Sequence, residues 1–310
     1  MEIRQVLCAE LERMMEENEK IVVIDADLSK PNGTFPLRKK FPDRAFDVGI
    51  AEQNMAGVAA GMSSYGFIPF ITSFTPFASR RICDQIAISI AYAKQNVKII
   101  GSDPGISAEF NGGTHMSMED IGVLRSIPDL VIYEVVDANQ FRQALPQIVA
   151  HEGPVYIRMF RKTIDDVFTD PDYKFDLFHA DTLQEGTDVS IFCSGIMVQE
   201  TVKANEILKA EGISADIISI HTVKPIDREA VITSAKKTGA VVTAENHNII
   251  GGLRSAVSEV LCEECPTPLR AVGVKDRFGQ VGKMPFLKEE YQMRAEDIVA
   301  AVKEVIALKK

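Results

Sequence analysis

The sequence predicts an α/β protein built of two doubly wound domains. Its 310 residues fit two domains at roughly 150 residues each. In both halves, short apolar runs alternate with amphipathic stretches, which is typical of parallel strands joined by crossover helices. The sequence turns polar and acidic, without a clear period, at 163–173. We therefore expect a first domain at 1–165, a linker with the first strand of the next domain at 166–184, and a smaller second domain at 185–310.

The first half begins with an amphipathic helix and continues with buried strands. In residues 1–20, apolar side chains recur at helical spacing among many charges, and this pattern predicts a helix. The segment lacks the apolar core of a signal peptide. The runs that we expect to form strands are 21–25, 97–100, 130–135 and 155–159.

The second half repeats this alternation. Strands are expected at 189–193, 215–220, 240–245 and 269–274, with helices such as 197–210 between them. Neither half carries G-x-G-x-x-G after its first strand or G-x-x-x-x-G-K-[ST], so the local fingerprints of dinucleotide and P-loop sites are absent from the sequence.

Composition limits the partners and the compartment. Thirty-four Lys and Arg against 44 Asp and Glu give a formal charge of -10, which argues against nucleic acid as a partner. No run approaches the ~20 apolar residues of a membrane span. Five scattered cysteines indicate a reduced, cytoplasmic protein without a disulfide framework. Cys262 and Cys265 form a single C-x-x-C pair with no second pair at metal spacing, so we assign no metal site.

The segment 46–66 holds the first candidate for chemistry. A short strand turns at Gly49 into a helix that Glu52 opens. Spacing alone explains Glu52 as an acidic residue that interacts favourably with the helix dipole. The alternative is a carboxyl group in a mostly apolar pocket, where desolvation suits it to general acid/base catalysis.

Aromatic residues crowd the next segment, at Phe67, Phe70, Phe74 and Phe77. Such crowding usually marks a core. The alternative for Phe74 and Phe77, which flank a strand-to-loop transition, is a stacking platform for a flat ligand.

Taken together, these blocks resemble the pyrimidine-binding domain of transketolases. The resemblance rests on GIAEQNMAGVAAGM followed by FIPFITSFTPFASRRICDQI, and it continues through 112–140. In the second half it includes TAENHNIIGG and DRFGQVGK, so that it covers essentially the whole chain. The family uses the block containing Glu245, Asn246 and His247 for packing and subunit contact, and we expect a structural role there.

The resemblance also implies a partner. A complete transketolase has a preceding domain that binds the cofactor's diphosphate and magnesium through a Gly-Asp-Gly start, and this sequence contains no Gly-Asp-Gly. It therefore resembles the C-terminal subunit of a split, two-chain transketolase that uses thiamine diphosphate and Mg²⁺. The N-terminal subunit is expected to hold the diphosphate and the metal, in a heterotetramer of two of each chain. The substrates implied are sugar phosphates, and the chain alone is expected to be inactive.

Cofactor roles follow residue by residue from the resemblance. Glu52 matches the glutamate that hydrogen-bonds the aminopyrimidine of thiamine diphosphate and promotes proton removal from its thiazolium ring. Phe74 and Phe77 match the pocket in which the pyrimidine stacks. Asp27, just after strand 21–25, is expected near the cofactor, with a turn or helix-cap aspartate as the alternative.

Substrate roles fall on the following segments. His115 matches a histidine that contacts the sugar hydroxyls and assists proton transfer during cleavage. Arg161 matches the arginine that holds the sugar phosphate, a role suited to a planar guanidinium, and Arg158 is its competitor. Asn111 stands where family members commonly carry an acidic residue that reads a substrate hydroxyl.

Asn111 is one of three departures from the family pattern. The family serine that helps to hold phosphate falls on Pro31, which has neither a hydroxyl nor a backbone N–H. An upstream histidine falls on Ser102 or Asp103. Because of these departures, the sequence does not identify the ketose donor or the aldose acceptor. Sulfonated, branched or deoxy sugars are alternatives to the usual pentose phosphates.

Two other functions compete with the transferase. One is the beta subunit of a 2-oxo acid dehydrogenase, against which the GGTHMSMED block argues. The other is a non-catalytic regulatory paralogue, against which the presence of Glu52, Phe74, Phe77 and His115 argues.

Overall fold

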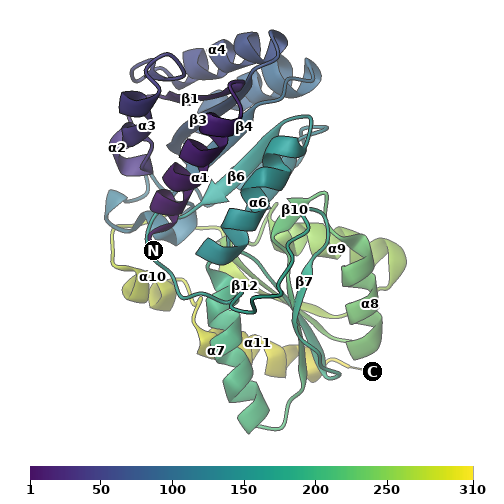
Figure 1. Cartoon of the computed structure of the whole chain (residues 1–310). Helices are drawn as coiled ribbons and strands as arrows, with labels where there is room; N and C mark the ends of the chain where they lie inside the picture. The colour runs from purple at the N-terminus through teal and green to yellow at the C-terminus, as the bar shows by residue number, and fades with distance from the viewer. Residues whose placement is uncertain (310) are drawn as a thin grey trace.

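The computed structural model describes residues 1–309, which form a seven-stranded and a five-stranded sheet flanked by helices (Figure 1). The predicted α/β class with two sheets is confirmed. Among these residues, no helix is both long enough and apolar enough to cross a membrane.

The first sheet has the strand order β10-β5-β6-β4-β3-β1-β2. Its strands are β1 (Ile21–Asp25), β2 (Ala45–Asp47), β3 (Ile68–Phe74), β4 (Lys98–Ser102), β5 (Val131–Glu134), β6 (Val155–Met159) and β10 (Thr222–Lys224). All neighbours pair in parallel except β10, which runs antiparallel to β5. The strands read as continuous apolar runs because helices cover both faces of a parallel sheet.

Helices on the two sides of this sheet belong to two buried clusters. One cluster includes α1 and α6, and the other includes α4 and η2. The helical segments of this half are α1 (Ile3–Glu17), α2 (Ser29–Asn32), α3 (Phe35–Lys40), α4 (Glu52–Ser64), η1 (Arg80–Ile82), η2 (Gln85–Tyr92), η3 (Gly105–Asn111), α5 (Asp120–Leu124) and α6 (Ala138–Ala150).

The second sheet has the order β12-β11-β8-β9-β7, with β7 antiparallel at one edge. Its strands are β7 (Asp181–Gln184), β8 (Val189–Cys193), β9 (Ala215–Ser219), β11 (Val241–Asn248) and β12 (Leu269–Val274). The helices of this half are α7 (Met197–Ala210), α8 (Arg228–Thr238), α9 (Leu253–Glu264), α10 (Met284–Glu290) and α11 (Ala295–Ile306).

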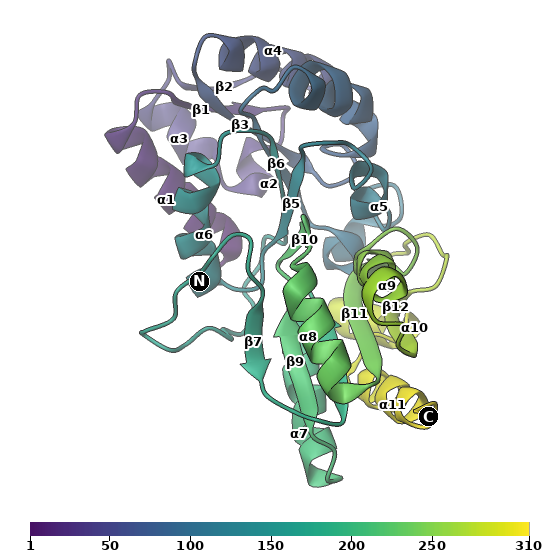
Figure 2. The ribbon, with the colours of Figure 1, turned by 90° about the vertical axis from the view of Figure 1, so that its right-hand side faces the viewer.

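The two halves are joined by more than the linker. Strand β10 follows β9 in the chain but completes the first sheet, and Figure 2 shows it between the two sheets. One buried apolar cluster extends from Ile3 in α1 to Val305 in α11. The linker itself lies along α6, where the Gln147 side chain bonds to the backbone of Phe175 and Leu177. The second domain is therefore packed firmly against the first.

Candidate active site

The predicted site residues gather at the carboxyl edge of the first sheet. Open α/β sheets bind ligands at this edge, because the loops that follow the parallel strands converge there. Phe74 ends β3 and Phe77 follows it, while His115 lies beyond β4 and Arg161 beyond β6. Glu52 is the first residue of α4, after the turn that follows β2.

Glu52 is a buried carboxylate with an arginine partner. Its residue is 4% exposed, and Arg81 Nη1 donates to its Oε1 over 2.7 Å. The turn before it needs Gly49, whose φ is +77° and whose N–H donates to Asp47 Oδ1 over 2.7 Å. The same Arg81 guanidinium lies over Phe77, with Cζ 3.9 Å from the ring centroid. Arg81 thus links the carboxylate to the aromatic residues, a role the sequence did not indicate.

Phe74, Phe77 and His115 form one aromatic group. The ring centroid of His115 lies 5.2 Å from that of Phe77 and 6.1 Å from that of Phe74, with edge-on geometry in both cases. The two phenylalanine centroids are 6.3 Å apart. Phe74 is buried, whereas Phe77 and His115 are partly exposed. The Nδ1 of His115 is 2.8 Å from the hydroxyl of Thr114.

Arg161 joins this group through Phe74, and Asp103 holds it there. Its Cζ lies 4.9 Å from the Phe74 centroid, and its Nε pairs with Asp103 Oδ2. The other Asp103 oxygen accepts the backbone N–H of Arg161 over 3.1 Å. Asp103 is 2% exposed, and burial raises the pKa of its carboxyl while Arg161 opposes this rise. The departure noted at this position therefore orients the predicted anion-binding arginine.

A cavity of about 270 Å³ adjoins Arg161. Its lining includes three cationic side chains, and each is paired with a carboxylate. The pairs are Arg161 with Asp103, Lys162 with Glu109, and Lys288 with Glu200. The charge around the cavity is therefore largely compensated.

Arg158, the predicted competitor of Arg161, is fully buried away from solvent. Its Nε donates to Asp120 Oδ2 over 2.8 Å, and its Nη1 pairs with Glu134. Its remaining Nη2 donates to the backbone oxygen of Asn246 over 2.7 Å. These partners occupy the guanidinium of Arg158, whereas Arg161 lines the cavity described above, which favours Arg161 as the predicted anion-binding arginine.

Asp27 and Asn111 lie at the same edge but outside the connected group. Asp27 is exposed, has φ +60°, and its backbone N–H donates to Asp47 Oδ1 over 3.0 Å. Asn111 is exposed at the end of η3. Within residues 1–309, no hydrogen bond or ion pair joins either side chain to Glu52 or to the aromatic group.

The other two departures have structural partners. The Ser102 hydroxyl donates to Asn32 Oδ1 over 2.7 Å, inside a buried network. The carbonyl of Pro31 accepts from Arg4 Nη1 over 3.3 Å. In the same network, desolvation raises the pKa of Asp25 to about 6, although hydroxyls of Thr34 and Thr72 donate to it.

The residues gathered at the carboxyl edge of the first sheet fit the heterocyclic part of a cofactor better than they fit a metal ion. A buried carboxylate beside a partly exposed aromatic face suits a flat, hydrogen-bonding ring. Among residues 1–309, no group of three or more His, Cys, Asp or Glu side chains is arranged to hold a metal ion. All five cysteines, including Cys262 and Cys265, are free thiols.

Comparison with known proteins gives consistent matches along the chain. Residues 1–165 match the family described as transketolase, pyrimidine binding domain, and residues 179–298 match transketolase, C-terminal domain. A 6-deoxy-6-sulfo-D-fructose transketolase subunit from Clostridium sp. (strain MSTE9) is 54% identical, over 94% of this chain and 90% of that protein. A putative transketolase C-terminal section from Methanocaldococcus jannaschii is 39% identical, over 92% of this chain and 90% of that protein.

A solved structure described as a split gene transketolase, inactive beta4 tetramer, has the same fold. Its TM-score to this chain is 0.91 at 44% sequence identity, and the match covers 100% of this chain and 99% of that one.

Proposed function

The chain belongs to the transketolase family, and from this premise we propose that it is the C-terminal subunit of a two-chain, thiamine diphosphate-dependent transketolase. It moves a two-carbon ketol unit from a ketose to an aldose, together with a separate N-terminal subunit. The observation that carries the proposal is one connected group of side chains. Arg81 joins Glu52 to Phe77, and Phe77 is joined in turn to His115, Phe74 and Arg161 by contacts of 4.9 to 6.3 Å.

The proposed chemistry divides among these side chains. Bound thiamine diphosphate supplies a nucleophilic carbon for the ketose carbonyl and a sink for the electrons of the broken carbon–carbon bond. Glu52, a buried carboxyl group, holds a proton at a ring nitrogen of the aminopyrimidine, as a general acid/base does. Phe77 and Phe74 orient the ring by stacking, and His115 hydrogen-bonds the sugar hydroxyls and moves a proton there.

The terminal anion of the substrate belongs at Arg161 in this proposal. A guanidinium at the end of a strand can bind an oxyanion through two N–H groups. The charge compensation around the adjacent cavity favours an anion with a single charge. A sulfonate has one negative charge at neutral pH, whereas a phosphate monoester has between about 1.5 and 2. Together with the 54% identical relative, this supports 6-deoxy-6-sulfo-D-fructose as donor in preference to a pentose phosphate.

A partner chain is also part of the proposal. Large apolar side chains are exposed on and beside α4 and η2, including Tyr65 at 87% and Tyr92 at 83%. Such patches mark protein interaction sites. We assign this face to an N-terminal subunit that holds the diphosphate and Mg²⁺, in a heterotetramer of two of each chain. The similar split gene structure, described as an inactive tetramer of beta chains, supports inactivity of this subunit alone, and the free thiols support a cytoplasmic location.

The test is a ketol-transfer assay with thiamine diphosphate and Mg²⁺, using this chain alone, the candidate N-terminal chain alone, and the mixture. The donors are 6-deoxy-6-sulfo-D-fructose and xylulose 5-phosphate, and the acceptor is ribose 5-phosphate. We expect transfer only in the mixture, with the sulfonated donor preferred and a four-carbon sulfonated aldose released.

Other outcomes identify the competing functions. Decarboxylation of pyruvate without ketol transfer would point to a 2-oxo acid dehydrogenase subunit. A Glu52→Ala mixture as active as wild type would show a regulatory role for this chain. Preference for xylulose 5-phosphate would overturn the sulfonate assignment and leave the transferase intact.

A further inference from the structure

We propose that the second domain positions the substrate-binding loop of the first, and that Asn246 is the residue through which it chiefly does so. The substrate loop is defined here as residues 103–118, which contain Asn111 and His115. This inference rests on the proposed function, because it concerns how the same site is held in shape. It assigns Asn246 as a positioning residue rather than a catalytic one.

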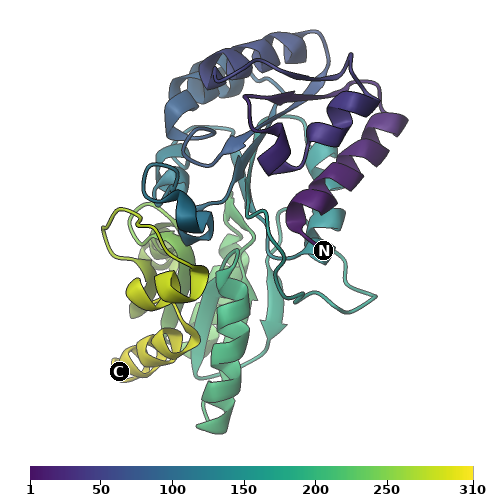
Figure 3. The same cartoon turned by 90° about the vertical axis from the view of Figure 1, so that its left-hand side faces the viewer.

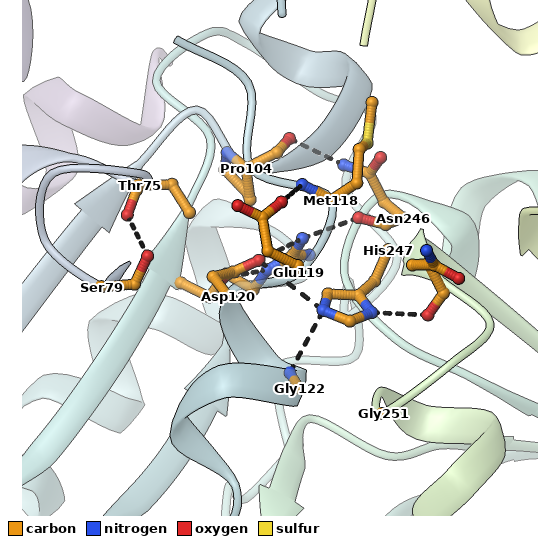
Figure 4. A network of polar contacts seen from close by, with 12 residues as sticks. Thr75, Ser79, Pro104, Met118, Glu119, Asp120, Gly122, Asn246, His247 and Gly251 are labelled. Atoms are coloured by element: carbon orange, nitrogen blue, oxygen red, sulfur yellow. Dashed lines mark hydrogen bonds and ion pairs between the residues drawn. The ribbon is translucent and has the colours of Figure 1, made fainter. Parts of the chain in front are cut away.

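The side chain of Asn246 binds the backbone at the start of the substrate loop. Asn246 is fully buried near the end of β11. Its Oδ1 accepts the N–H of Ile106 over 2.9 Å, and its Nδ2 donates to the carbonyl of Pro104 over 2.9 Å. Both bonds span the domain boundary, and Figure 4 shows the Pro104 contact. The carboxamide thus holds one turn of the loop backbone through two hydrogen bonds, an arrangement called the clamp below.

Gly105, between the two bonded residues, fits the clamp closely. Its φ is +54°, and a Cβ at this position would lie 2.2 Å from Asn246 Oδ1. Because there is no space for a side chain, the loop backbone and the carboxamide are in direct contact. Any side chain at position 105 would therefore have to displace either the carboxamide or the loop.

The clamp itself is fixed to the first sheet. The backbone carbonyl of Asn246 accepts from Nη2 of Arg158 over 2.7 Å. Arg158 is held in β6 by Asp120 and Glu134, and all three side chains are buried. Asn246 therefore sits between a rigid strand of the first domain and the loop.

Other parts of the second domain contact the rest of the loop. The N–H of Asn248 donates to the carbonyl of Met118 over 2.7 Å, at the loop's end. The N–H of Met284 donates to Glu109 Oε1 over 2.9 Å, near its middle. A Cβ on Gly113 would lie 2.5 Å from the carbonyl oxygen of Gly279. Figure 3 shows the yellow C-terminal segment beside the blue loop of the first domain.

These contacts separate the substrate side of the site from the cofactor side. His115 is carried by the loop, so its position 5.2 Å from Phe77 depends on contacts with the second domain. Glu52 and Phe77 belong to α4 and to the segment after β3 in the first domain. Loosening the loop is therefore expected to weaken sugar binding while thiamine diphosphate binding is retained.

The experiment compares Asn246→Ala with wild type in the assembled two-chain complex. We expect the KM for the ketose donor to rise about tenfold, because two buried hydrogen bonds are lost and their backbone partners are left unpaired. The Kd for thiamine diphosphate is expected to change less than about twofold, since binding of the cofactor does not use this contact. In this chain alone, amide hydrogen exchange at 104–118 is expected to accelerate.

Two further variants keep the test decisive. Asn205→Ala removes another buried asparagine of the second domain, on α7, and is expected to leave the donor KM and loop exchange at wild-type values. If Asn246→Ala does not fold, Gly279→Ala replaces it, because its Cβ would lie 2.4 Å from Sδ and 2.9 Å from Cβ of Met116, a buried residue of the loop. It is expected to raise the donor KM and loop exchange in the same way.

Each result decides for or against the inference. Unchanged exchange at 104–118 would overturn it, whether or not the complex is a transketolase. Faster exchange with an unchanged donor KM, or an equal loss of cofactor affinity, would also overturn it. If wild type transfers no ketol unit but the exchange changes as expected, the proposed function fails while the second domain's hold on the loop stands.

Discussion

Arg81 donates a hydrogen bond to Glu52 over 2.7 Å while its guanidinium lies 3.9 Å from the centroid of the Phe77 ring. One side chain thereby occupies both the carboxylate and the aromatic face to which the aminopyrimidine is assigned. A ring that stacks on the face of Phe77 covered by Arg81, or bonds to Oε1 of Glu52, would have to displace Arg81. We therefore expect Arg81 to compete with the aminopyrimidine at the proposed cofactor site.

Arg81→Met is accordingly expected to tighten thiamine diphosphate binding. A cation–π contact contributes about 0.5–1 kcal/mol and an ion pair whose arginine side chain is 44% exposed about 0–1 kcal/mol. The gain in affinity is therefore expected to lie between about 2-fold and 30-fold. The measurement is calorimetric titration of the two-chain complex. Arg80→Met, which removes a neighbouring arginine paired with Glu119, is the control. Weaker binding by Arg81→Met would show that Arg81 assists the cofactor.

Glu52→Gln is expected to abolish most turnover. Glutamine keeps the size and a hydrogen-bonding group but cannot exchange a proton at the ring nitrogen, and general acid/base catalysis contributes about 10²–10⁴ in rate. Steady-state kcat is the measurement, with the thiamine diphosphate Kd expected to stay within a few-fold of wild type. A kcat near that of wild type would remove Glu52 from the mechanism.

Arg161→Ala is expected to raise the KM of any ketose with a terminal anion. Hydrogen bonds to charged groups contribute about 1.5–3 kcal/mol, which corresponds to about 10- to 150-fold. The KM of a donor without a terminal anion serves as the internal control, because it makes no such bond. Similar losses for both donors would mean that Arg161 acts on the structure of the site.

Asp103→Asn tests the charge compensation separately. It keeps a side chain of the same size beside Arg161 but removes the negative charge, so a dianion gains more attraction than a monoanion. At about 1 kcal/mol for one added unit charge 4 Å away in a water-like dielectric, the donor preference is expected to move about fivefold toward phosphate. The ratio of kcat/KM for the sulfonated and phosphorylated donors measures this shift, and an unchanged ratio contradicts it.

The order of helices and strands along the chain was largely predictable, because the local pattern of apolar and polar residues determines it. The buried strands β1, β4 and β6 read as apolar runs, and Glu52 opens α4 after the Gly49 turn as expected. Strand β10 was not predicted. It is only three residues long, and its place in the first sheet is set by pairing with β5, which lies some ninety residues earlier in the chain.

The site was predictable only where a family motif marked it. Phe77 and His115 lie close together as the resemblance implies, and their catalytic roles stay predictions. The sequence did not predict the partners that orient such residues, because these partners are distant along the chain. Arg81 lies 29 positions from Glu52, and Asn246 lies 140 positions from Ile106. An asparagine near the end of a strand has no local pattern that distinguishes a residue that positions a loop from ordinary packing, so Asn246 was interpreted only as structural.

Glu245 links the second domain's stability to pH. Its residue is fully buried, and its oxygens accept the N–H groups of Leu253 and Arg254 at the start of α9 over 2.6 and 3.0 Å. Desolvation nonetheless raises the pKa of Glu245 from 4.5 to about 8, and the nearby Glu134 adds to the rise. Between these values the folded chain keeps a proton that the unfolded chain has lost. The free energy of unfolding therefore falls as pH rises through this window, by up to about 1.4 kcal/mol per pH unit for one proton.

Glu245→Gln is expected to remove this contribution, because glutamine is neutral throughout the window. Denaturant unfolding of both proteins at pH 5, 6 and 7 gives the measurement, and the variant's stability relative to wild type is expected to increase with pH. Glu206→Gln, at an exposed position of α7 paired with Lys209, is expected to give a difference that stays constant over the same range. A Glu245→Gln difference that stays flat, or falls with pH, would mean that Glu245 is ionised in the folded protein and stabilised by the N-terminus of α9.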